Sequence, residues 1–159
     1  MKVLGISAYY HDSAAAIIVD GSVLYAVQEE RFSRIKNDDS FPEEAIKFCL
    51  KESGINLKEI DAIAFYDKPF LKFERLLETY YAFSPKGFKS FAKAMPVWLK
   101  EKLFIKQLLK KRLKALSEGD KNLKFNIVFP EHHLSHIAST FYTSPFKKSA
   151  FLTVDGVGE

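Results

Sequence analysis

The sequence is poor in cysteine and has no long apolar run. Because a single cysteine cannot form a disulfide within the chain, a disulfide-stapled secreted domain is excluded, and we expect a cytoplasmic location. No stretch approaches the roughly 20 apolar residues of a membrane-spanning helix. Residues 1–8 form a short apolar run without the basic region that opens a signal peptide. The lone Cys49 follows an apolar helical pattern, so we predict a buried packing thiol.

Positive charge is concentrated in one segment of the chain. The 159 residues carry a net charge of +4, whereas residues 83–125 contain twelve lysines and arginines and three acids, a net charge of +9. We therefore predict a basic helical insertion at about residues 70–124 within an otherwise acidic fold. No recognised nucleic-acid-binding module accompanies this charge, so no nucleic-acid partner is expected. Contact of the insertion with an anionic membrane surface or an acidic partner remains open.

Apolar runs separated by turn signals predict the order of the secondary-structure elements. The first three runs form an antiparallel meander of strands, with a tight Asp20-Gly21 turn between the second and the third. A helix follows, capped by Ser40 or Phe41 with Pro42 at its first position, and it ends at Gly54. The strands are expected at residues 3–8, 14–19, 23–27, 62–66, 125–129 and 150–154, and the helices outside the insertion at about 42–52 and 133–142.

This order of elements is typical of the ribonuclease-H-like topology. Three strands, a helix and a strand precede the insertion, and a strand, a helix and a strand follow it. Actin-like (ASKHA) ATPases and sugar kinases contain this topology twice. We therefore predict an α/β fold that forms one actin-like half-domain, with a mixed sheet of five or six strands, helices on its faces and the basic insertion.

Three of the four histidines lie in the segment His132-His133-Leu134-Ser135-His136. On a helix, residues four apart lie on one face, so the imidazoles of His132 and His136 can share a divalent metal ion. Imidazole suits ions of the iron, zinc or manganese class. The alternative is a helix start with hydrogen-bonded histidines and no metal.

The segment Val154-Asp155-Gly156-Val157-Gly158 ends the last expected strand with an acid followed by glycines. Glycines let backbone amides approach an anion closely, and the carboxylate of Asp155 can hold a metal. Gly156 and Gly158 are therefore candidate phosphate-binding positions. A plain turn is the alternative.

The turn between the first two strands, residues 9–16, contains the polar residues His11 and Asp12 among small ones. In an actin-like domain this turn faces the nucleotide phosphates, and His11 can act there as a general base or as a donor that orients the ligand. A surface hairpin is the alternative. The segment 29–38, which includes Lys36, mixes charges of both signs, and its composition favours a solvated loop.

Four stretches of this sequence together resemble a known family. G-I-S-A-Y-Y-H-D-S-A-A-A, E-E-R-F-S-R-I-K, E-H-H-L-S-H-I-A-S and V-D-G-V-G-E, in this order, are similar to the N-terminal part of the NodU/CmcH O-carbamoyltransferases. The resemblance runs from Val3 to Glu159 and is weakest over the basic insertion. In the family, a YrdC-like domain makes carbamoyl-adenylate from carbamoyl phosphate and ATP. The first domain, which resembles the tRNA threonylcarbamoyl-adenosine synthase subunit, transfers the carbamoyl group to an acceptor hydroxyl.

The resemblance also implies roles for particular residues. The metal ligands would be His132, His136 and Asp155, together with an aspartate from sequence beyond residue 159. His11 and Asp12 would be the catalytic residues near the reacting groups. The positions that bind the nucleotide or carbamoyl-adenylate would be Lys36, Asp155, Gly156 and Gly158.

The resemblance implies that residues 1–159 are the first half of the N-terminal actin-like domain. The second half and the YrdC-like domain are expected to be partners from the same polypeptide, so we expect the chain alone to be an inactive fragment. The acceptor would be a small molecule or an oligosaccharide, and the insertion is expected to shape the acceptor-binding side. Two other classes remain open: an actin-like kinase or phosphotransferase, and a non-catalytic binding module that uses the insertion. A bound divalent ion would favour the transferase over both.

Overall fold

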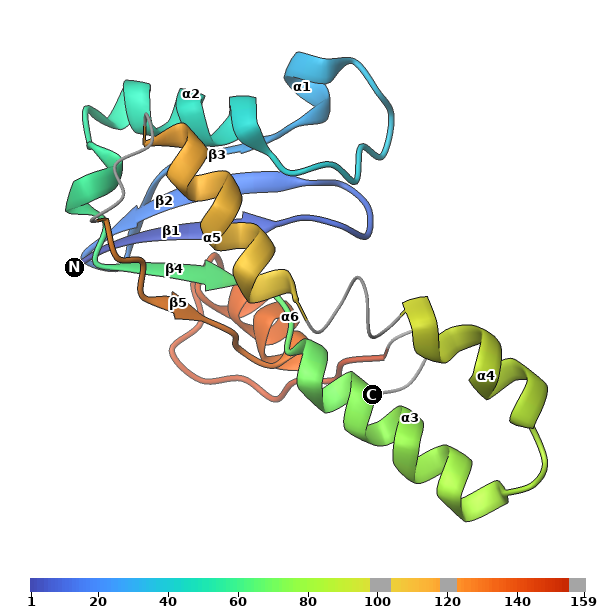
Figure 1. The fold of residues 1–159 in the computed structure, drawn as a ribbon. Coiled ribbons are helices and arrows are strands. Elements are labelled where there is room, and N and C mark those ends of the chain that lie inside the picture. Colours follow the sequence, from blue (N-terminus) through green and yellow to red (C-terminus); the bar gives the residue numbers. More distant parts are fainter. Residues whose placement is uncertain (98–103, 118–122, 155–159) are drawn as a thin grey trace. The chain divides into compact units, whose positions relative to one another are not determined.

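The computed structural model describes residues 1–97, 104–117 and 123–154 of the chain (Figure 1). The chain forms two compact units. The first contains Met1–Tyr66 and Leu109–Phe129, and the second contains Asp67–Leu108 and Pro130–Glu159. Helix α5, Ile105–Leu116, begins in the second unit and ends in the first.

The first unit is built around a five-stranded sheet with the strand order β3-β2-β1-β4-β5. Strand β2 runs antiparallel to both of its neighbours, whereas β4 is parallel to β1 and β5 is parallel to β4. A meander at one side and parallel strands at the other define the ribonuclease-H-like half of the actin-like fold, so the predicted fold class is confirmed. The strands are β1 Lys2–Ser7, β2 Ala14–Val19, β3 Ser22–Gln28, β4 Ala62–Phe65 and β5 Ile127–Val128.

Strand register aligns the apolar side chains of one face of the sheet. Leu4 of β1 lies opposite Ile17 of β2 and Ile63 of β4, and all three are almost completely buried. Side chains alternate between the two faces of a strand, so the next matching set also falls on this face. That set is Ile6, Ala15 and Phe65. The result is a continuous apolar layer across the three central strands.

Helix α2, Glu43–Ser53, packs against β2 and β3. Its buried residues are Ala45, Ile46 and Cys49. The Cys49 thiol donates a hydrogen bond of 3.6 Å to the Ala15 carbonyl oxygen, and burial raises the pKa of the thiol. The prediction of a buried packing thiol is therefore confirmed.

Two predicted chain reversals are also confirmed. Asp20 and Gly21 both have positive φ, 49° and 85°, which is the requirement of the tight type I′ turn between β2 and β3. At the end of α2, Gly54 adopts the left-handed conformation, and its N–H donates to the carbonyl groups of Leu50 and Lys51. A glycine is favoured there because a Cβ atom is strained at positive φ.

The start of α2 differs from the prediction. The helix begins at Glu43, one residue later than expected, and no side chain of Ser40, Phe41 or Pro42 caps it. The carboxylate of Glu29, directly after β3, instead accepts hydrogen bonds from the N–H groups of Glu44 at 3.1 Å and Ala45 at 2.8 Å. A negative charge at this position satisfies two amides of the first helical turn and interacts favourably with the helix dipole.

The strand expected at residues 150–154 does not form. A strand requires a neighbouring strand for its backbone hydrogen bonds, and an apolar run carries no information about that neighbour. Leu152 and Val154 are 89% and 82% exposed, so this run is also not buried by the described residues. The strand expected at 125–129 is reduced to Ile127–Val128, for which β4 provides the partner.

The insertion is helical where the structure describes it, as predicted. No helix in the described ranges is both long and apolar enough to cross a membrane. The remaining helices are α1 Glu30–Ser33, the 3₁₀ turn η1 Leu57–Glu59, α3 Pro69–Phe83, α4 Phe88–Val97 and α6 His132–Phe141.

Replacing Glu29 by alanine is expected to lower the free energy of unfolding by about 2 kcal/mol, because the buried N–H of Ala45 and that of Glu44 lose their acceptor. Glu29→Gln, which keeps one acceptor oxygen, should cost less. Urea unfolding followed by circular dichroism measures both. The matched control is Glu52→Ala on the exposed side of α2, which should change stability by no more than about 0.5 kcal/mol. Equal losses for Glu29→Ala and Glu52→Ala would contradict the capping role.

Candidate functional site

The predicted histidine pair lies on the first turns of α6, which begins at His132. The Nε2 atoms of His132 and His136 are 3.1 Å apart, and their ring centroids are 4.5 Å apart with the planes at 80°. The i, i+4 spacing therefore brings the two imidazoles together, as predicted. His136 is exposed and His132 is half-buried, so the pair is open to solvent on one side.

The separation of the two nitrogens fits chelation of one metal ion. Two Nε2 atoms 3.1 Å apart, each at about 2.05 Å from a common ion, subtend an angle of about 98° at that ion. This lies between the angles of about 90° in octahedral and about 109° in tetrahedral coordination. The same separation also permits a hydrogen bond in which one Nε2–H donates to the other nitrogen. In the hydrogen-bonded state one Nε2 carries a proton, whereas both Nε2 atoms are unprotonated when they bind a metal ion.

The rest of the predicted ligand set is incomplete. Asp155, Gly156 and Gly158 lie outside the described residues, and within the described ranges no third histidine, cysteine or acid joins the pair. His133 follows His132 in sequence, but its ring centroid lies 6.1 Å from that of His132. Adjacent helical residues point about 100° apart, which explains why His133 does not take part in the pair.

In the first unit, His11 and Asp12 form a second pair. The Nδ1 atom of His11 lies 2.7 Å from the Asp12 carboxylate, and both side chains are partly exposed. A carboxylate at Nδ1 favours the tautomer with the proton on that nitrogen, which leaves Nε2 with a free lone pair. The Asp12 carboxylate thus holds the His11 ring in one orientation, and the catalytic role of the two residues stays a prediction.

The loop that carries this pair has an unusual backbone. Tyr9 and Asp12 adopt positive φ, 70° and 52°, which is uncommon for residues with a Cβ atom. Such conformations persist only where the surrounding structure holds them, and they are concentrated at functional sites. The loop is held at both ends, because the N–H groups of Tyr9 and Ser13 donate to the carbonyl oxygens of Asp39 and Asp38, each at 2.8 Å.

The segment 29–38 is exposed along residues 31–37, as its composition favours, but its two ends are buried. Asp38 is 6% exposed, and hydrogen bonds from the hydroxyl of Ser33 and from the hydroxyl and N–H of Ser40 hold the pKa of its carboxyl below the ordinary value. Glu29, at the other end of the segment, is also buried. Asp38 and Ser40 have the spacing of an Asx turn, so their hydrogen bond could have been predicted from the local sequence. The residues that hydrogen-bond to the Glu29 carboxylate are distant in sequence and gave no such signal.

Tyr9 and Lys36 are the remaining residues of interest in the first unit. Tyr9 is hydrogen-bonded to Arg112 of α5, and burial raises the pKa of its hydroxyl although Arg112 acts in the opposite direction. Nothing local in the sequence links these residues, which are about a hundred positions apart. Lys36 lies in the turn after α1 and is exposed, so its predicted role in ligand binding stays a prediction.

Comparisons with known proteins identify the class of this protein. A family model described as "Carbamoyltransferase N-terminus" matches residues 2–159. The chain therefore belongs to the carbamoyltransferase family and forms its N-terminal part. This confirms the resemblance derived from the four sequence stretches.

Individual relatives agree with this assignment. The chain is 57% identical to the uncharacterized protein sll1178 of Synechocystis sp., over 99% of the chain and 26% of that protein. It is 36% identical to the nodulation protein NolNO of Sinorhizobium fredii, over 96% of the chain and 20% of that protein. Nodulation protein U of the same species is 26% identical, over 94% of the chain and 25% of that protein. The chain thus spans about a quarter or less of the length of these relatives.

A solved structure, that of YeaZ from Pseudomonas aeruginosa, is similar with a TM-score of 0.39 and 14% sequence identity. The similarity covers 82% of this chain and 43% of that one.

The carboxyl group of Asp38 makes stability depend on pH in a defined direction. Because its pKa is lowered by folding, its contribution is present above the ordinary pKa and is lost as the pH falls through the folded pKa. Asp38→Asn should therefore lower the free energy of unfolding at pH 7, and the difference from the natural protein should shrink as the pH falls through the lowered pKa of Asp38. Urea unfolding over a series of pH values from pH 7 downward measures this. The control is Asp39→Asn at the exposed neighbour, and a pH-independent effect of Asp38→Asn would contradict the account.

We expect the histidine pair to bind one divalent ion. In titrations with Zn²⁺, Mn²⁺ or Co²⁺ followed by calorimetry, His132→Ala and His136→Ala should each weaken binding at least about tenfold, because each removes one arm of the chelate. The matched control is His133→Ala, which removes an imidazole from the same helical turn but not from the pair, and it should leave the affinity almost unchanged. An equal loss with all three variants would show that no chelating pair exists.

Proposed function

We propose that this domain carries out the transfer half of an O-carbamoyltransferase. The donor is carbamoyl-adenylate, made from carbamoyl phosphate and ATP elsewhere in the polypeptide, and the acceptor is a hydroxyl group of a small molecule or oligosaccharide. The observation that supports this proposal is membership of the carbamoyltransferase family over residues 2–159. A histidine pair whose separation suits one metal ion and a histidine–aspartate pair fit this chemistry, whereas a simple phosphotransferase has no need for the histidine cluster.

His11 is proposed to be the general base. Carbamoyl-adenylate is a mixed anhydride, so the acceptor oxygen attacks its carbonyl carbon, the bond to the phosphate oxygen breaks, and AMP leaves. The proton of the acceptor hydroxyl passes to Nε2 of His11, while the Asp12 carboxylate holds Nδ1–H and stabilises the resulting imidazolium. The fixed loop backbone keeps the ring in place during this transfer.

His132 and His136 are proposed to hold a divalent ion, with Asp155 and an acid from outside the chain as the other ligands. When bound, such an ion acts as a Lewis acid that stabilises negative charge on a phosphate or carbonyl oxygen. The contribution of this chain is to present two neutral imidazoles at a separation suited to one ion. Lys36, Gly156 and Gly158 are proposed to contact the nucleotide part of the donor.

The proposal separates two half-reactions that can be measured independently in the polypeptide that carries this domain together with the rest of the enzyme. His11→Ala should reduce carbamate formation by about 10²- to 10⁴-fold, the usual contribution of a general base. Formation of carbamoyl-adenylate, followed as pyrophosphate release that depends on carbamoyl phosphate, should be retained. His136→Ala should likewise reduce carbamate formation and retain carbamoyl-adenylate formation.

The matched control for His11→Ala is Tyr10→Phe, which alters the exposed neighbour whose ring lies 4.5 Å from that of His11 but keeps the ring. It should retain carbamate formation. Loss of both half-reactions to the same extent in well-folded His11→Ala and His136→Ala proteins would contradict the assignment of transfer to this domain.

A further inference from the structure

Helices α3 and α4 of the second unit form a helical hairpin. They are joined by residues 84–87, in which the Lys86 N–H donates to the Phe83 carbonyl oxygen and Gly87 adopts a positive φ of 81°. The rings of Tyr80 on α3 and Phe91 on α4 stack with centroids 4.0 Å apart and planes 12° apart. This aromatic stack fixes the end of the hairpin, which we call the hairpin tip and define as residues 79–93.

Large aromatic side chains of the hairpin tip are exposed. Tyr81, Phe83 and Phe88 have 88%, 66% and 59% of their surface accessible. Burying one aromatic ring stabilises a complex by more free energy than an ordinary surface contact does. Several exposed rings at one end of a hairpin therefore indicate an interaction surface. Tyr80 stacks on Phe91 and also lies against Phe88, with ring centroids 6.4 Å apart, so Phe88 is exposed on its other side.

The charge of the hairpin tip has one sign. Lys86, Lys89 and Lys93 are exposed, and residues 79–93 contain no acid. The lysines alternate with the exposed rings along the chain, because Lys86 lies between Phe83 and Phe88 and Lys89 follows directly. Positive charge and aromatic surface therefore occupy the same few residues.

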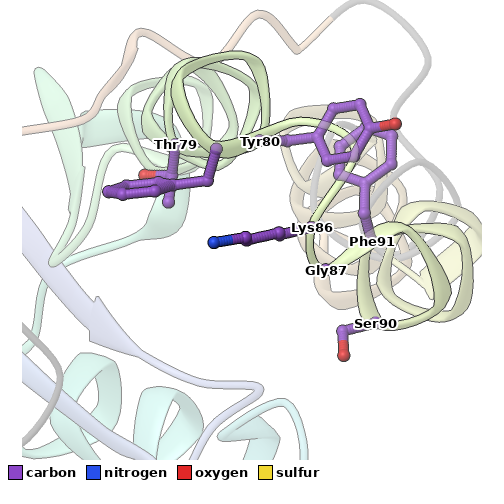
Figure 2. Close-up of a pocket in the computed structure, with 7 residues that line it drawn as sticks. Thr79, Tyr80, Lys86, Gly87, Ser90 and Phe91 are labelled. Carbon is purple, nitrogen blue, oxygen red and sulfur yellow. The ribbon is translucent and has the colours of Figure 1, made fainter.

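A hollow of about 450 Å³ lies between the two helices at this tip (Figure 2). It is lined mainly by apolar surface from Tyr80, Phe83 and Phe91, with Gly87 and Ser90 at its α4 side. In Figure 2 the side chain of Lys86 extends from the connecting loop, away from the stacked rings, with its nitrogen at the far end. An apolar hollow with a single cation suits an acyl chain or glycerol backbone below an anionic head group.

We propose that the hairpin tip docks on the surface of an anionic phospholipid bilayer. At a membrane surface, aromatic rings reside at the level of the head groups, lysine stems lie along apolar surface, and the ammonium groups reach the phosphates. A protein partner fits less well, because lysine is depleted in the cores of protein interfaces, whereas here it is interleaved with the rings. The uniform positive charge selects an anionic surface, and each lysine close to it adds about fivefold to the affinity.

The test is co-sedimentation of the protein with vesicles of phosphatidylcholine alone or mixed with phosphatidylglycerol. Binding is expected only to the anionic vesicles, and it should weaken with added salt. Lys86→Glu/Lys89→Glu should reduce binding by about 25-fold or more, since two lysines are lost and two like charges are added. Phe83→Ser/Phe88→Ser should reduce it at least about tenfold, because two interfacial rings are lost. Both pairs are exposed, and unchanged circular dichroism confirms folding.

Matched controls distinguish the hairpin tip from general surface effects. Lys110→Glu/Lys114→Glu makes the same change of net charge on the exposed side of α5, and Phe146→Ser removes an exposed ring after α6. Neither should change vesicle binding by more than about threefold. Equal losses in the controls would overturn the proposal, because binding would then follow net charge alone. Binding to polyglutamate but not to vesicles, or a change of oligomeric state in the phenylalanine variant, would overturn it in favour of an acidic protein or a second copy.

Discussion

The buried carboxylate of Glu29 is the constraint on which the first unit depends. It follows β3 directly, and its oxygens satisfy the first amides of α2, while its own N–H donates to the Ser13 carbonyl oxygen at 2.8 Å. One residue thus connects the antiparallel meander, the helix that packs against β2 and β3, and the end of the loop that carries His11. The helix needs this outside acceptor because its own N-terminal residues provide no side-chain cap.

The same region explains how a strained loop is maintained. Positive φ angles at Tyr9 and Asp12 cost conformational energy, which tertiary contacts must offset. The carbonyl groups of Asp38 and Asp39 bind the two ends of the loop, and the Asp38 carboxylate is in turn fixed by Ser33 and Ser40. The orientation of the His11–Asp12 pair therefore depends on residues that do not belong to the pair.

The sequence predicted those features that depend on local pattern. The meander, its Asp20-Gly21 turn, the left-handed Gly54 and the facing of His132 and His136 all follow from residue type and spacing. It failed where the structure depends on partners distant in the chain. The cap of α2 comes from a residue fourteen positions before the helix, and Tyr9 contacts Arg112 within the insertion, about a hundred positions away. Residues 150–154 have a strand-like pattern but pair with no strand among the described residues.

The central claim is that the two histidines of α6 hold one divalent ion in a carbamoyl-transferring enzyme. Anomalous diffraction at the metal edge, from crystals of the whole enzyme grown with Mn²⁺, tests it most directly. The account predicts a single peak at about 2.0–2.2 Å from Nε2 of both His132 and His136, with a carboxylate completing the site. A peak elsewhere, with the two nitrogens still hydrogen-bonded to each other, would contradict it.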